Sequence, residues 1–101
     1  MEIFKRLNKK GYKHYYDGTV EELDSMDKDN QHLHSEIMQI VMWLYEKHGI
    51  LIYVYRLGDD FEYIIDVDNG AFIEIGKYEK RLKTIQEAYE AAIEYVLTNL
   101  I

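Results

Sequence analysis

The most regular pattern of apolar and polar residues lies between residues 35 and 56. Apolar positions recur there at three- and four-residue steps, the period of a helix with one buried face, at Ile37, Ile40, Val41, Leu44 and His48. Ser35 can cap the start of this helix, and Gly49 can end it in a left-handed conformation. Residues 50–56 are β-branched, aromatic or leucine as far as Arg56, which predicts a strand. Because one glycine joins the two elements, the helix must fold back across the sheet that this strand begins.

Two more strands are predicted downstream, over residues 61–67 and 71–75. An even first turn, of two or four residues, pairs Ile52 with Ile65. For the second turn, a three-residue loop that holds Gly70 in the left-handed conformation pairs Ile65 with Ile73, which keeps one sheet face apolar. The commoner two-residue turn would place Ile65 opposite Glu74 and mix the two faces. The sequence therefore favours the three-residue loop.

A closing helix is predicted from the capping-box spacing of Thr84 and Glu87, followed by an apolar stripe as far as Leu100. The N-terminal third predicts four elements in order: a short helix over residues 2–10, a short strand over 12–16, a short helix or second strand after Thr19, and a polar loop over 27–34.

The predicted fold class is therefore α+β, in a single domain over residues 1–101. Its core, over residues 33–101, is a three-stranded antiparallel meander with two helices on one face (α-β-β-β-α). Residues 1–32 add an N-terminal helical or irregular segment. A chain of 101 residues can bury one core without disulfides or a metal.

The other face of the predicted sheet is too apolar to be left in water. The register places five apolar or aromatic residues on it, Leu51, Tyr53, Tyr55, Ile64 and Phe72. Either residues 1–32 cover this face, which we favour, or two copies of the protein pack their sheets together. The residues expected to provide the intrachain cover are Phe4, Leu7, Tyr12 and Tyr15.

Trp43 is a further candidate for an interaction surface. It shares a helix face with Glu36, Gln39, Glu46 and Lys47, a face that should meet water. The favoured interpretation is that the N-terminal segment covers its ring, because large apolar groups are usually buried. The alternative is an exposed aromatic anchor for a partner.

Net charge, cysteine content and the length of apolar runs make some classes of function less favourable. The net charge of −7 makes a nucleic-acid partner unfavourable, because phosphates repel an acidic chain. There is no cysteine, no signal-peptide pattern and no apolar run long enough for a membrane span, so we expect a cytoplasmic protein. Ten tyrosines are typical of half-buried sheet faces or contact surfaces.

No catalytic arrangement of residues stands out, so we expect a non-enzyme without a metal or cofactor. His32 and His34 lie in the predicted polar loop without further ligands nearby, and a zinc site needs three or four. Asp59, Asp60 and Glu62 surround a predicted turn and are interpreted as solvated surface residues.

The element order also allows one nucleic-acid alternative. Double-stranded-RNA-binding domains share the order helix, three strands, helix, and use lysines at the start of their last helix to hold phosphates. Four basic residues precede the closing helix here, Lys77, Lys80, Arg81 and Lys83. This is an analogy of fold, which does not by itself imply function.

Two stretches, residues 43–52 (WLYEKHGILI) and 84–97 (TIQEAYEAAIEYVL), resemble a family of small uncharacterised proteins from bacteria and their phages. The chain departs from that family at Tyr45, where arginine is common, and at Ile85, where tyrosine is common. The resemblance covers about two-thirds of the chain, and implies the fold more than an activity. Together with the surplus of aromatic residues, it leads us to expect a protein-interaction module, of phage or mobile-element origin, that binds a protein partner or itself.

Overall fold

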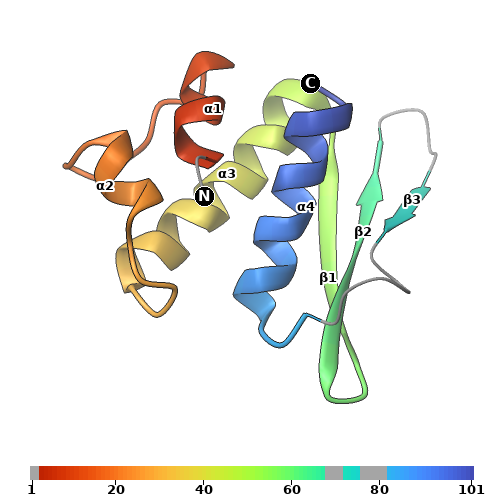
Figure 1. Cartoon of the computed structure of the whole chain (residues 1–101). Helices are drawn as coiled ribbons and strands as arrows, with labels where there is room; N and C mark the ends of the chain where they lie inside the picture. Colours follow the sequence, from red (N-terminus) through yellow and green to blue (C-terminus); the bar gives the residue numbers. More distant parts are fainter. Residues whose placement is uncertain (1–2, 68–71, 76–81) are drawn as a thin grey trace.

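The computed structural model describes residues 3–67, 72–75 and 82–101 (Figure 1). The elements follow in the order α1 (Ile3–Lys9), α2 (Val20–Asp24), α3 (Gln31–His48), β1 (Leu51–Leu57), β2 (Asp60–Asp66), β3 (Phe72–Ile75) and α4 (Ile85–Asn99). The predicted α+β class is confirmed.

The start of α3 lies five residues, more than one turn, earlier than expected. Asn30, not Ser35, is the N-cap, and its side-chain oxygen accepts a hydrogen bond from the backbone N–H of His32 at 2.8 Å. The added turn brings Leu33 onto the apolar stripe, four residues before Ile37, where it is buried. The prediction of a polar loop over residues 27–34 is therefore wrong for residues 31–34, which belong to α3. The predicted helix end is confirmed, since Gly49 is left-handed with φ of 66°.

The predicted capping box of the closing helix is also confirmed, and of the two alternatives left open after Thr19 the helix is the one that forms. The side chain of Thr19 accepts from the N–H of Glu22 at 3.1 Å and begins α2. The side chain of Thr84 accepts from the N–H of Glu87 at 3.0 Å and begins α4. Each cap satisfies an N–H group that has no partner within its helix.

β1 and β2 form an antiparallel hairpin in the expected register, with Ile52 opposite Ile65. Leu57 lies opposite Asp60, so the loop has two residues, and its first residue, Gly58, has φ of 64°. A glycine with positive φ at that position is the requirement of a type II′ turn, whose twist suits a hairpin. β3 pairs antiparallel with β2, with Ile73 opposite Ile65. The loop predicted at residues 68–70 lies outside the described residues, so the conformation of Gly70 stays a prediction.

The core lies between this sheet and the helices α3 and α4 (Figure 1). α4 contacts both β1 and β2, while α3 contacts β1 and α4. The inner sheet face contributes Ile52, Tyr63 and Ile65, all buried. Leu82, just before α4, accepts a hydrogen bond at 2.8 Å from the N–H of Phe61, which holds the start of α4 against β2.

The N-terminal segment packs on the helices and not on the sheet. α1 contacts α2 and α4, and Figure 1 shows both short helices on the side of α3 and α4 away from the strands. Phe4 and Leu7 are buried there, whereas Tyr15 is 72% exposed. Our expectation that residues 1–32 cover the outer sheet face is therefore wrong. The physical reason is burial: Ile3, Phe4 and Leu7 enter the core beside α2 and α4. Arg6 adds a partly exposed ion pair with Glu94 and donates to the hydroxyl of Thr98 at 3.0 Å.

Candidate functional site

The outer face of the β1–β2 hairpin carries four of the six predicted interaction residues. Tyr53 lies opposite Ile64 and is 46% exposed, while Leu51, Tyr55 and Ile64 are half-buried. None of these four belongs to the hydrophobic core or packs against it. The backbone of Phe72, the fifth predicted residue, pairs with that of Asp66. The hairpin thus brings an aromatic and aliphatic row together on the face that α3 and α4 leave free.

Carboxylates accompany this row. Glu62 lies opposite Tyr55 and accepts a hydrogen bond from its hydroxyl at 2.8 Å. Asp66 lies opposite Leu51 on the same face. Among the described residues of β1 and β2, no lysine or arginine shares this face, because Arg56 lies on the alternate phase of the strand. On these two strands the outer face is therefore both apolar and acidic.

Trp43, the sixth predicted residue, lies apart from this row. Its ring meets Tyr12 edge-on, with centroids 5.4 Å apart, and meets His48 edge-on at 5.0 Å. The indole is half-buried against the core. These contacts agree with the favoured interpretation, in which the N-terminal segment covers the ring.

Sequence reasoning missed the role of Glu36. Its carboxylate is 2% exposed and accepts hydrogen bonds from the hydroxyl of Tyr12 and from the backbone N–H groups of Tyr15 and Tyr16, at 3.0 and 2.8 Å. Burial, reinforced by this carboxylate, raises the pKa of Tyr12, so its hydroxyl remains a donor. The N–H groups of Tyr15 and Tyr16 donate to Glu36 and so are not available for pairing with another strand. Residues 12–16 do not form the predicted strand.

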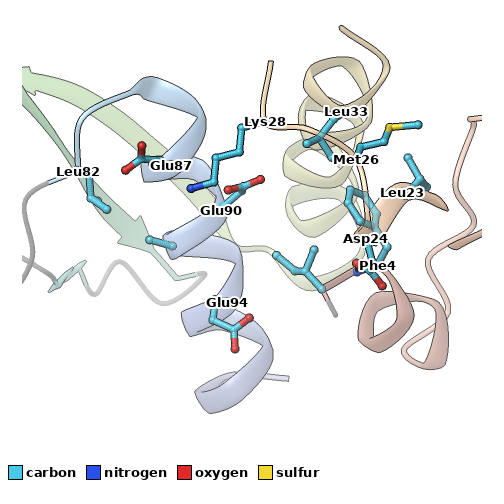
Figure 2. A pocket seen from close by; sticks show the side chains of 12 residues that line it. Phe4, Leu23, Asp24, Met26, Lys28, Leu33, Leu82, Glu87, Glu90 and Glu94 are labelled. Carbon is cyan, nitrogen blue, oxygen red and sulfur yellow. Dashed lines mark hydrogen bonds between the residues drawn. The ribbon is translucent and has the colours of Figure 1, made fainter. Parts of the chain in front are cut away.

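A groove of about 460 Å³ opens between the N-terminal helices, α3 and α4 (Figure 2). Its apolar lining comprises Ile3, Phe4, Leu23, Met26, Leu33, Leu82 and Ala91. Its charged lining comprises Asp24, Lys28, Glu87, Glu90 and Glu94. Sequence reasoning missed this groove, because no local pattern shows that α1 and α2 pack beside the helix face that carries Glu87, Glu90 and Glu94.

The groove carboxylates differ in what already binds them. Asp24 accepts from the N–H groups of Phe4 and Lys5, at 2.8 and 3.2 Å, and so caps α1. Glu94 is paired with Arg6. Glu87 accepts only from a backbone N–H, and Glu90 only from the amide of Gln86 at 3.3 Å, among the described contacts. Glu87 and Glu90 therefore keep a negative charge that no described cation neutralises.

The basic residues of the nucleic-acid alternative are only partly described. Lys83 forms a 2.7 Å ion pair with Asp60, across the gap between α4 and β2. Lys77, Lys80 and Arg81 lie outside the described residues.

The predicted histidine pair lies in the first turn of α3. His32 lies beside the ring of Tyr16, with centroids 5.4 Å apart, and Nε2 of His34 lies 2.8 Å from the carbonyl oxygen of Lys28. In the described part of the chain, no three His, Asp or Glu side chains come together as metal ligands would. Every helix in the described ranges is too short or too polar to span a bilayer.

No protein-family model, curated protein or solved structure matches this chain. The resemblance to small bacterial and phage proteins therefore stays a prediction, as do the functions considered for it.

Proposed function

We propose that this chain is a non-enzymatic interaction module that binds a basic partner protein through the outer face of its hairpin. The observation that carries the proposal is the exposure of Tyr53, at 46%, in a row with Ile64 that has no part in the core. Tyrosine is enriched at protein interfaces because its ring offers rigid apolar area and its hydroxyl offers a hydrogen bond.

The charge of this face selects the kind of partner. A second copy would bring Glu62 and Asp66 against the same carboxylates, in a chain whose net charge is already −7. Like charges brought together across an interface cost affinity and slow association. A basic surface with apolar side chains would instead satisfy both the carboxylates and the aromatic row.

We also propose that the α-β-β-β-α core is the unit that presents this face. The pairing of β2 with the four described residues of β3 supports a meander, and the contacts of α3 and α4 with the hairpin support two helices on one face.

The test uses a photoreactive phenylalanine at position 53 of the full chain, in cells that naturally express it. The matched control places the same residue at position 45, because Tyr45 is similarly exposed, at 57%, but lies on α3. We expect a covalent adduct with one basic polypeptide from position 53 and not from position 45. That polypeptide, once purified, should bind wild type and Tyr45→Glu equally, and Tyr53→Glu at least tenfold more weakly.

Three outcomes would count against the proposal. Equal adducts from both positions would mean that the sheet face is not selective. An adduct with a second copy of the chain would replace the basic partner by self-association. Retention of duplex RNA that Lys83→Ala abolishes would favour the nucleic-acid alternative.

A further inference from the structure

We propose that the groove between the N-terminal helices and α4 is a second docking site, which binds a basic amphipathic helix of a partner protein. This inference is independent of the sheet face, since the groove lies on the opposite side of α3 and α4 (Figures 1 and 2).

The groove has the shape and lining of such a site. Its volume of about 460 Å³ has room for several side chains but not for a whole helix, so only the apolar face of the helix would enter. Phe4, Leu23 and Leu33 line it from three different elements. All three are almost fully buried and fix the shape of the groove from beneath, so the apolar surface that a ligand would contact comes from the half-buried Met26 and Ala91.

The wall formed by α4 supplies the charge complementarity. Glu87, Glu90 and Glu94 are three and four residues apart, so they form one row along the helix, about 10 Å long. Lysines at the same spacing on a helix lying beside α4 would meet this row. Glu87 and Glu90 would carry most of the attraction, because Glu94 is already paired with Arg6.

Lys28 indicates how a ligand cation would sit. Its side chain is the one cation among the described residues that line the groove, and Figure 2 shows it extending across the opening toward Glu90. It lies there without an ion pair at contact distance among the described residues. A lysine of a partner would compete with it for the same carboxylate, so Lys28 opposes binding.

The probe is a fluorescent, capped thirteen-residue peptide of leucine and lysine at helical spacing, titrated into the full chain while its anisotropy is followed. We expect saturable binding that weakens with salt. Two substitutions should act in opposite directions: the double variant Glu87→Gln/Glu90→Gln weakens binding about tenfold, whereas Lys28→Ala strengthens it severalfold. Glu46→Gln, on exposed α3 surface, removes the same kind of charge and should leave the affinity unchanged.

Specificity is tested with a scrambled peptide of identical composition that has no apolar face. Equal binding of both peptides would mean that only net charge attracts them, and would overturn the proposal. The absence of saturable binding to wild type, or a Lys28→Ala variant that binds more weakly, would overturn it too. Tyr53→Glu should bind the peptide as wild type does, so failure here is distinguishable from failure at the sheet face.

Discussion

At the scale of single residues, the carboxylate of Glu36 joins α3 to a segment that lies 20 to 24 positions earlier in the chain. Glu36→Gln keeps the shape but leaves one carbonyl oxygen for three donors, and turns an amide N–H₂ toward them. Because buried donors would lose their acceptor, we expect the free energy of unfolding to fall by about 2–3 kcal/mol, measured by urea denaturation.

The control for that substitution is Glu46→Gln, on the same helix. Glu46 is exposed, so its replacement should change the free energy of unfolding by no more than about 0.5 kcal/mol. Similar losses from both variants would show that a general effect of charge on α3, and not the buried hydrogen bonds, governs stability.

At the scale of elements, the hairpin depends on the backbone of Gly58. A Cβ at this position would meet no atom within 4 Å, so any cost of substitution comes from its positive φ and not from a clash. We expect Gly58→Val to lower stability by about 1–2 kcal/mol, and Gly58→Asn to lower it less, because asparagine tolerates the left-handed region. Thermal unfolding of the two variants measures the difference, and equal losses would contradict this turn geometry.

The elements also show what a sequence can predict. The cap at Thr84, the helix end at Gly49 and the register of the first hairpin follow from neighbours in the chain, and all were predicted. After Thr19 the sequence left a helix and a second strand open, and the helix forms. The place of the N-terminal segment was not, because it depends on contacts such as Arg6 with Glu94, 88 positions apart. Amphipathic spacing shows that a face is buried, but it does not show against what. For the same reason the groove could not be foreseen, while the aromatic row on the hairpin could.

At the scale of the whole molecule, one hydrophobic cluster runs from α1 to the sheet. Leu7 is fully buried in it, so Leu7→Ala should lower the free energy of unfolding by about 2–5 kcal/mol. Leu57→Ala is the matched control, since Leu57 is 51% exposed and its replacement should lower the free energy of unfolding by less than about 1 kcal/mol.

Because the cluster is continuous, the Leu7→Ala variant should still unfold in a single transition, followed by circular dichroism and tyrosine fluorescence together. An early, separate loss of helix signal would mean that the N-terminal layer melts on its own.

The attachment of α1 to α4 also has a consequence for biosynthesis. Ribosomes add about 5–20 residues per second, so α1 leaves the exit tunnel several seconds before the surface of α4 on which it packs. A helix of seven residues is not stable alone in water, so in that interval it is largely unfolded. The nascent chain therefore displays Ile3, Phe4 and Leu7 together, a short apolar segment of the kind that chaperones bind, until the last helix is made.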